Sequence, residues 1–249
     1  ERLNIKLDKA LLAHPASKAG IELALWDLKG KALDVPVYQL LGGRFRSGIE
    51  LMCMVDLANP KTMAQQASSL LEEKPYPVVK MKIGINPSTD LARYRAVSAA
   101  VAGKAVLQVD GNRGYRLAEA IPTLQEMEDI GNLGAVEQPV ARLHDLAEVE
   151  ARLAAPVMAD EMIFSPQDAI EVVNHRAASM ALIKITKHGG LLDVMRIASV
   201  FDAAGLILSV AVYPDIMEAA AAHVAAAIPC VRWPSFPTKL EDTLLVEPL

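Results

Sequence analysis

The sequence is short of cysteine, with only Cys53 and Cys230 among 249 residues. The two cysteines lie far apart in the chain, and each has apolar neighbours. Disulfide scaffolds and metal clusters need more cysteines at closer spacing. We therefore predict two reduced thiols buried in a core.

Positive charge is not in excess either. The chain has 25 Lys and Arg against 30 Asp and Glu, which gives a formal net charge of −5. This balance argues against a protein that binds nucleic acid or an anionic membrane through a basic surface. We expect neither as a partner.

Long hydrophobic runs are missing as well. The longest, residues 219–231, is interrupted by His223 and Pro229. It is shorter than the roughly 20 residues that a membrane span requires. The first residues show no charged-then-apolar signal pattern, and we expect a cytoplasmic protein.

The chain does have ample material for a core, since 52% of its residues are hydrophobic and 22% are charged. These values are typical of well-packed globular proteins. A single α/β barrel commonly needs about 250 residues, so the length fits one such domain.

From about residue 50, short β-branched apolar runs alternate with longer amphipathic segments. This alternation is typical of repeated βα units on a parallel sheet. It predicts an α/β, TIM-like barrel of about seven to eight strands. Seven strands are expected at residues 50–55, 78–83, 105–109, 135–137, 157–159, 181–185 and 206–212, and an eighth within 233–249.

Helix starts support this pattern. The pairs Asn59-Pro60, Asn86-Pro87 and Ser165-Pro166 each fit an N-cap residue followed by proline in the first turn. Before the barrel, residues 17–33 predict one amphipathic helix, which we interpret as the end of a separate helical element.

Charged residues fall at or near the ends of successive predicted strands. In a parallel barrel the carboxyl ends of the strands converge on one mouth, so these side chains are expected to meet there. Any one of them, taken alone, is better interpreted as a solvated charge at a strand end. Together they predict an active site, and they are Lys80, Lys82, Asp110, Glu137, Asp160 and Lys184.

Strand alternation sends Lys80 and Lys82 to the same face, because Met81 between them points the other way. Two inward lysines need carboxylate partners, and three carboxylates on adjacent strands would supply them. These carboxylates also form an all-oxygen set suited to Mg²⁺. The five histidines lack the spacing of zinc ligands.

A cation flanked by lysines indicates removal of a proton α to a carboxylate, with the cation stabilising the enediolate. Like-charge repulsion between Lys80 and Lys82 is expected to lower the pKa of each, which would suit a base. With Lys184 on the opposite face, racemisation or epimerisation becomes possible. A cycloisomerisation that uses one lysine fits equally well.

These residues stand in motifs that resemble the enolase superfamily, specifically the muconate-lactonizing branch of its mandelate racemase and muconate lactonizing enzyme-like proteins. The motifs are VVKMKIG, VDGN, VEQP, MADE and IKITKHGG, and the stretches SKAGIELALWDLKGK and LLGG precede them. The resemblance implies a barrel at 46–249 and, at 1–45, the incomplete end of an α+β capping domain.

The resemblance also implies roles. Asp110, Glu137 and Asp160 resemble the Mg²⁺ ligands, and Lys82 and Lys184 resemble the acid/base pair. Lys80 would assist the substrate carboxylate and tune Lys82. Asn112 and Glu161 resemble groups that orient the metal ligands, and Asn112 is also a candidate for substrate contact. Lys187 is a rival to Lys184, and His188 is either a substrate contact or an exposed loop residue.

Two departures from the family pattern matter. Relatives carry a longer N-terminal region that closes over the barrel mouth, and most of it is not found in this sequence. At the end of the seventh strand, Tyr213 stands near the position where many relatives have Glu. Tyr213 is therefore a candidate for substrate binding, although packing at the mouth explains it as well.

The leading hypothesis is an Mg²⁺-dependent isomerase, either a cycloisomerase or a racemase/epimerase, acting on a small-molecule carboxylate. The alternatives are a hydroxy-acid dehydratase with the same proton abstraction and a catalytically silent truncated barrel. Relatives are often symmetric assemblies, so we expect a homo-oligomer. The sequence does not choose the carboxylic acid, because fold does not determine substrate.

Overall fold

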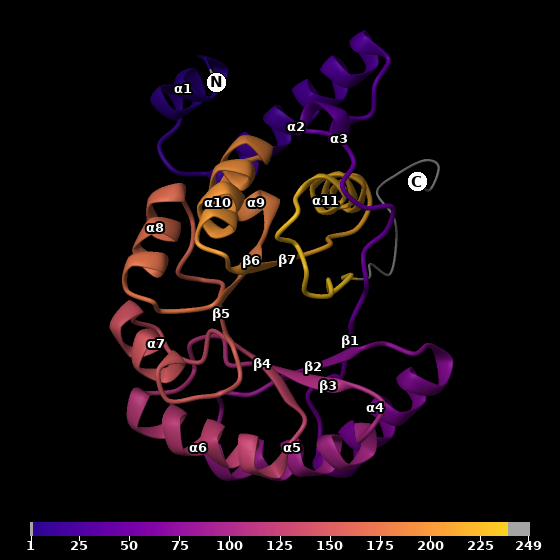
Figure 1. Ribbon diagram of the computed structural model, residues 1–249, viewed down its shortest axis with the longest axis vertical. Coiled ribbons are helices and arrows are strands. Elements are labelled where there is room, and N and C mark those ends of the chain that lie inside the picture. The colour runs from indigo at the N-terminus through magenta and orange to yellow at the C-terminus, as the bar shows by residue number, and fades with distance from the viewer. Residues whose placement is uncertain (1, 239–249) are drawn as a thin grey trace. The chain divides into compact units, whose positions relative to one another are not determined.

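The computed structural model describes residues 2–238, and the chain divides into two compact units. The first consists of Glu1–Ile49, Ile163–Ile170 and Leu182–Leu249, and the second of Glu50–Met162 and Glu171–Ala181. The second unit alternates strands and helices, whereas the first begins with three helices (Figure 1).

The second unit is a series of βα units. Along the chain it contains β1 (Cys53–Met54), α4 (Pro60–Glu73), β2 (Val78–Lys82), α5 (Pro87–Val101), β3 (Val106–Asp110), α6 (Leu117–Ile130), β4 (Leu133–Glu137), α7 (Leu143–Glu150) and β5 (Val157–Ala159). Neighbouring strands pair in parallel and in chain order. The register places Lys82 beside Asp110 and Asp110 beside Glu137.

Local sequence explains the helix starts. The side chains of Asn59 and Asn86 accept hydrogen bonds from the N–H groups of Thr62 and Thr89 at 3.0 and 3.2 Å. Each asparagine is followed by proline at the first helical position, where a missing N–H costs nothing. The predicted starts of α4 and α5 are confirmed.

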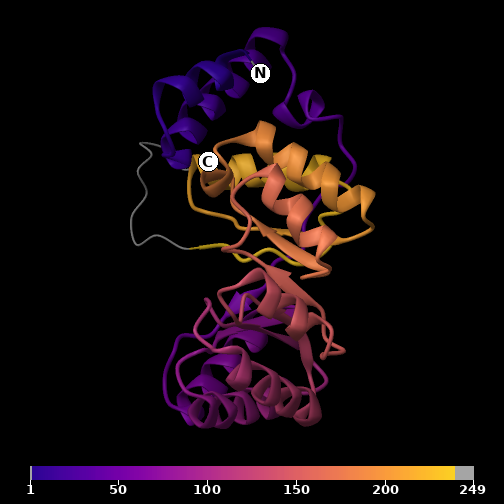
Figure 2. The ribbon, with the colours of Figure 1, turned by 90° about the vertical axis from the view of Figure 1, so that its left-hand side faces the viewer.

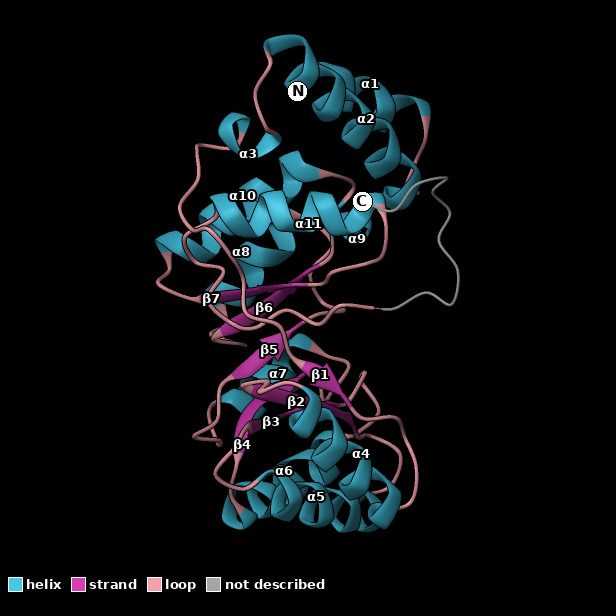
Figure 3. Cartoon of the chain, turned by 90° about the vertical axis from the view of Figure 1, so that its right-hand side faces the viewer, coloured by secondary structure: helices cyan, strands magenta, loops and turns pink. Residues whose placement is uncertain are grey.

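The core of this unit lies between the strands and helices α4, α5 and α6, which run along one side of β1 to β4 (Figure 3). Fully buried side chains from both layers fill it: Met63, Val79, Met81, Tyr94, Val97, Leu107, Val109, Leu124 and Met127. Because strand side chains alternate, Lys80 and Lys82 point to the face opposite Met81. That face carries the candidate site.

The first unit begins with α1 (Arg2–Ala10), α2 (Pro15–Leu33) and α3 (Val37–Leu40). It also holds α9 (Ile185–His188), α10 (Leu191–Ala203), β7 (Ile207–Val210) and α11 (Ile216–Ala227). Helix α2 packs on α9 and α10, and α3 packs on α11 (Figure 2). The division between the units falls within α8 (Pro166–Asn174) and β6 (Met180–Ile183).

The structure confirms seven strands in one sheet and the helix at 17–33, which extends to Pro15. Several strand boundaries differ from prediction; β4 begins at Leu133 and β7 ends at Val210, and two further differences concern β1 and β6. β1 is only two residues long, and β6 ends at Ile183 rather than including Lys184. The predicted eighth strand lies mostly outside the described residues, although isolated parallel bridges join Leu208 to Val231 and Val212 to Pro237. The proposed boundary between residues 45 and 46 stays a prediction.

Both cysteines are buried and free, as predicted. Within the part of the chain that the structure describes, no helix combines the length and the hydropathy that a membrane span requires.

Candidate active site

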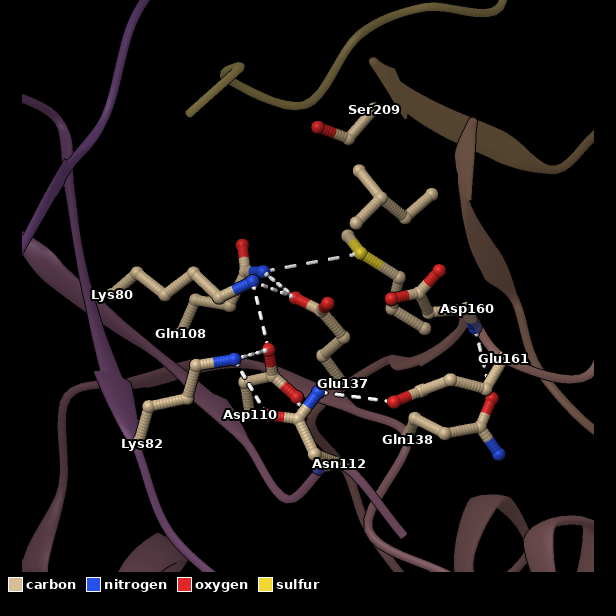
Figure 4. Close-up of polar contacts among 12 residues, drawn as sticks. Lys80, Lys82, Gln108, Asp110, Asn112, Glu137, Gln138, Asp160, Glu161 and Ser209 are labelled. Atoms are coloured by element: carbon tan, nitrogen blue, oxygen red, sulfur yellow. Dashed lines mark hydrogen bonds and ion pairs between the residues drawn. The ribbon is translucent and has the colours of Figure 1, made fainter. Parts of the chain in front are cut away.

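The candidate site is built from the carboxyl ends of four neighbouring strands in the second unit. Lys82, Asp110 and Glu137 are the last residues of β2, β3 and β4, and Asp160 directly follows β5. Figure 4 shows both lysine side chains pointing toward Asp110. The parallel register brings these residues together, as the sequence predicts.

Lys80 is buried between two carboxylates. Its Nζ lies 2.6 Å from Glu137 Oε2 and 2.9 Å from Asp110 Oδ2, and its side chain is 8% exposed. Burial by itself would lower the pKa of Lys80, but the Glu137 and Asp110 carboxylates outweigh burial and raise it well above its usual value. The expected lowering by Lys82 is therefore wrong for Lys80, which stays protonated.

Lys82 occupies a more open position. Its Nζ donates hydrogen bonds to Asp110 Oδ2 at 2.6 Å and to Asn112 Oδ1 at 2.5 Å. The side chain is 36% exposed, against 8% for Lys80. Lys82 is thus the lysine of the pair that a ligand from solvent can reach.

The carboxylates respond to burial and to the lysines in opposite ways. Burial would raise the pKa of Asp110, but Lys80 and Lys82 together lower it to about 2. Burial raises the pKa of Glu137 to about 7, and although Lys80 opposes this rise, the charges of Asp110 and Asp160 add to it. The negative charges of Asp110 and Asp160 therefore act on Glu137, and a cation placed among the three carboxylates would be attracted to them.

Further polar residues surround these groups. Asn112 Nδ2 donates to Glu161 Oε1 at 3.0 Å, and the N–H of Asp160 donates to Gln138 Oε1 at 2.9 Å. Asn112 adopts a left-handed backbone with φ of 40°, a conformation that asparagine tolerates better than most residues. Asn112 and Glu161 thus contact each other, and Asn112 also contacts Lys82; their role in orienting metal ligands stays a prediction.

The donor chemistry fits a hard cation. Glu137 Oε1 and Glu161 Oε2 are buried and, within residues 2–238, accept no hydrogen bond. Unsatisfied buried carboxylate oxygens are costly unless a cation or donor reaches them. Among the described residues, however, no group of three His, Cys, Asp or Glu side chains is arranged closely enough to hold a metal ion. The ammonium group of Lys80 instead bridges two of the three predicted ligands.

The remaining predicted residues belong to the first unit. Lys184 follows β6 as the N-cap of α9, so it does not lie within the strand as predicted. His188 is 3% exposed, with Nδ1 at 3.3 Å from the carbonyl oxygen of Phe164, so the exposed-loop interpretation is wrong. Lys187 approaches the carbonyl of Leu182 at 3.4 Å, and Tyr213 follows the bridge residue Val212. The roles predicted for Lys184 and Tyr213 stay predictions.

Sequence reasoning missed Gln108. This residue is buried, and its Nε2 donates to Glu137 Oε2. Gln108 precedes Asp110 by two residues in β3, so it lies on the same face as the site. The period of two could have identified it, but a neutral side chain carries no charge signal.

Two family models match the chain. The model "Enolase C-terminal domain-like" matches residues 62–249, and "Mandelate racemase / muconate lactonizing enzyme, N-terminal domain" matches residues 1–42.

Curated relatives are similar over most of the chain. An L-Ala-D/L-Glu epimerase of Clostridium acetobutylicum is 34% identical over 232 residues, which cover 91% of this chain and 64% of the epimerase. Muconate cycloisomerase 1 of Pseudomonas putida is 37% identical over 207 residues, which cover 82% of this chain and 55% of the cycloisomerase. The chain thus spans about 55–64% of the length of these relatives.

Solved structures agree with this similarity. Muconate cycloisomerase from Pseudomonas fluorescens has a TM-score of 0.91 at 29% identity, covering 98% of this chain and 68% of that one. A dipeptide epimerase from Enterococcus faecalis, complexed with Mg and L-Leu-L-Tyr, has a TM-score of 0.87 at 30% identity, covering 94% and 67%. The α/β, TIM-like fold and the two family matches show that this chain belongs to the mandelate racemase and muconate lactonizing enzyme branch of the enolase superfamily.

Proposed function

We propose that the chain is the catalytic part of an isomerase, either a cycloisomerase or a racemase/epimerase, that moves a proton at the carbon α to a carboxylate. The observation that carries this proposal is the pair of lysines at the end of β2 and their unequal burial beside acidic residues. The relatives described above include epimerases and cycloisomerases, which supports the same reaction class.

Lys82 is the proposed acid/base group. Its ammonium nitrogen is partly open to solvent and is held by Asp110 and Asn112, so its direction is defined before a substrate arrives. Preorganisation of this kind lowers the barrier to proton transfer. Lys80, which stays protonated, would supply fixed positive charge for the substrate carboxylate. Lys184 is proposed as the second acid/base group on the strength of its motif, and Tyr213 as a substrate contact.

Asp110, Glu137 and Asp160 would hold Mg²⁺, with Asn112 and Glu161 orienting them. The unsatisfied oxygen of Glu137 and the all-oxygen donor set support this assignment. To bind the ion, Asp110 and Glu137 would release their contacts with Lys80. Bound there, Mg²⁺ would supply positive charge beside the substrate carboxylate and so favour loss of the α-proton.

Deuterium exchange tests the proposal directly. The protein is incubated with Mg²⁺ in D₂O with L-Ala-L-Glu, L-Leu-L-Tyr, N-succinyl-L-Arg or muconate, and mass spectrometry follows deuterium uptake. We expect uptake by at least one compound, and we expect Lys82→Ala to abolish it. Lys104→Ala removes an exposed lysine outside the site and serves as the matched control.

Other outcomes would point elsewhere. Loss of water from an added hydroxy acid would favour the dehydratase. No uptake from any compound, with Mg²⁺ bound, would leave the catalytically silent barrel as the better description.

A further inference from the structure

The feature outside the site with the most unusual surroundings is Asp90, a fully buried carboxylate in the first turn of α5. Its Oδ2 accepts hydrogen bonds from three successive backbone N–H groups, those of Gly84, Ile85 and Asn86, at 3.0 to 3.1 Å. The Tyr115 hydroxyl donates to the same oxygen at 2.7 Å. Four donors on one carboxylate oxygen fix it strongly.

Capping of α5 does not explain this arrangement. Asn86 already caps the helix through the N–H of Thr89. The Asp90 carboxylate instead points back at the turn that follows β2. Lys82 is the last residue of β2, and only Ile83 separates it from Gly84. Asp90 therefore determines the path of the backbone just beyond the proposed acid/base lysine.

Tyr115 connects this turn to the next one. It lies in the loop between β3 and α6, which also contains Asn112 and follows Asp110. The two loops touch through backbone, since a Cβ on Gly84 would lie 2.4 Å from the carbonyl oxygen of Gly111. Burial, together with the hydrogen bond to Asp90, raises the pKa of Tyr115, so the phenol keeps its proton and remains a donor.

A third loop joins the same group. Arg93, one turn further along α5, contacts Asp90 Oδ1 at 3.3 Å and donates through Nε to the carbonyl oxygen of Ala58 at 2.9 Å. Ala58 lies between β1 and α4. The loops that follow β1, β2 and β3 are thus tied to one carboxylate, and the last two of these strands carry site residues.

We propose that Asp90 and Tyr115 are positioning residues of the candidate site, which hold the loops after β2 and β3 so that Lys82 faces Asp110 and Asn112. Lys82 Nζ lies within 2.6 Å of both partners, and small shifts of either loop would break these contacts. This inference rests on the proposed function of Lys82. Neither residue touches the reacting groups itself.

Two tyrosines offer a matched test. Tyr115→Phe removes the hydroxyl that reaches Asp90. Tyr94→Phe removes the hydroxyl of another buried tyrosine, on α5, which donates at 2.8 Å to Gly131, ahead of β4 and at the other end of the strands. Both variants lose one tyrosine hydrogen bond, and only the first is expected to alter the site loops. Asp90→Asn, followed by Asp90→Glu as a test of rescue, examines the carboxylate itself.

The first readout is kinetic, with L-Ala-L-Glu and muconate as probes. We expect Tyr115→Phe to lower kcat about tenfold while KM changes by less than about twofold, because loop displacement disturbs proton transfer more than binding. Tyr94→Phe should leave kcat within about twofold. Equal kcat values for the two variants would overturn the proposal.

The second readout does not depend on turnover. Amide hydrogen exchange should become about tenfold faster at 83–86 and 111–114 in Tyr115→Phe, and in Tyr94→Phe only around Gly131. If the wild-type protein turns over none of the probes, the proposed function fails while this measurement still decides the inference. Unchanged exchange in both loops of Tyr115→Phe would then overturn it.

Discussion

At the scale of single residues, Lys80 and Lys82 illustrate how two identical side chains two positions apart acquire different surroundings. Both contact Asp110 Oδ2, but Lys80 is enclosed and also binds Glu137, whereas Lys82 reaches solvent. A buried lysine held by two carboxylates cannot give up its proton readily. The proposed division of roles, with Lys80 as fixed charge and Lys82 as acid/base group, rests on this difference in burial.

This difference predicts opposite effects on stability. Lys80→Met leaves Asp110 and Glu137 buried without their shared cation, and we expect it to lower the free energy of unfolding by about 3–5 kcal/mol. Lys82→Ala should cost less than about 1 kcal/mol, since Lys80 still pairs with Asp110, yet it should abolish exchange. Urea denaturation and the deuterium assay measure the two effects. Equal stability losses would contradict the assignment.

The buried thiols predict a pH dependence. Burial raises the pKa of Cys53 and of Cys230 to about 11. Between about pH 9 and 11 the unfolded chain loses these protons while the folded chain retains them, so the free energy of unfolding falls as pH rises through this window. Urea denaturation at pH 8 and pH 10.5 measures the fall. It should be smaller in the Cys53→Ala/Cys230→Ala double variant, and an identical fall would refute the explanation.

At the scale of elements, the helix starts and the strand order were predictable because both depend on local signals. Asn-Pro pairs cap α4 and α5, and apolar runs match β2 and β5 closely. The end of β6 was not predictable, because Lys184 is followed by another apolar residue, Ile185, and only tertiary context begins α9 there. The short length of β1 was not predictable either, because it is set by the two residues that pair with β2.

The candidate site was likewise predictable only in part. The positions of Lys80, Lys82, Asp110 and Glu137 follow from strand alternation and parallel register. The raised pKa of Lys80 and the network around Asp90 do not, since both depend on distances between segments that are far apart in sequence.

One contact between elements leads to a further prediction. Glu22 of α2 is buried, and its Oε1 accepts hydrogen bonds from Trp26 Nε1 and from the N–H of Leu192, both at 3.0 Å. Leu192 lies in the first turn of α10, where a carboxylate satisfies an open donor and the helix dipole. Because Gly190 has no side chain, it leaves space for the Glu22 carboxylate; a Cβ at this position would overlap Glu22 Oε2.

We expect Glu22→Ala to lower the free energy of unfolding by about 1–3 kcal/mol, because the α10 N–H and the Trp26 indole lose a charged acceptor. Glu72→Ala, which removes an exposed carboxylate of α4, should change it by less than about 0.5 kcal/mol. Thermal and urea unfolding provide the comparison. A Glu22→Ala variant as stable as Glu72→Ala would show that α2 and α10 are held together by apolar packing alone.

At the scale of the whole molecule, Lys80 explains how the folded chain tolerates a buried and partly unsatisfied cluster of acidic residues. Lys80 compensates Asp110 and Glu137 in this structure, so the cluster is not left as bare repelling charges. Binding of Mg²⁺ would exchange this internal cation for an external one. The folded state would then gain free energy that the unfolded chain, which has no preformed site, does not.

The resulting prediction is stabilisation by Mg²⁺. At a concentration 100 times the dissociation constant, a ligand that binds only the folded state raises the free energy of unfolding by about 2.7 kcal/mol. We expect Mg²⁺ to raise the Tm of the wild-type protein and of Asp129→Asn, which alters an exposed carboxylate at the far end of α6. Asp110→Asn should lose the Mg²⁺ response even where its Tm without Mg²⁺ is unchanged, because the amide is a poor ligand for this ion.

Differential scanning calorimetry with MgCl₂ and with NaCl at equal ionic strength separates binding from screening. An equal Mg²⁺ response in Asp110→Asn and Asp129→Asn would mean that the ion binds elsewhere and that the acidic residues at the strand ends serve only to pair with the lysines.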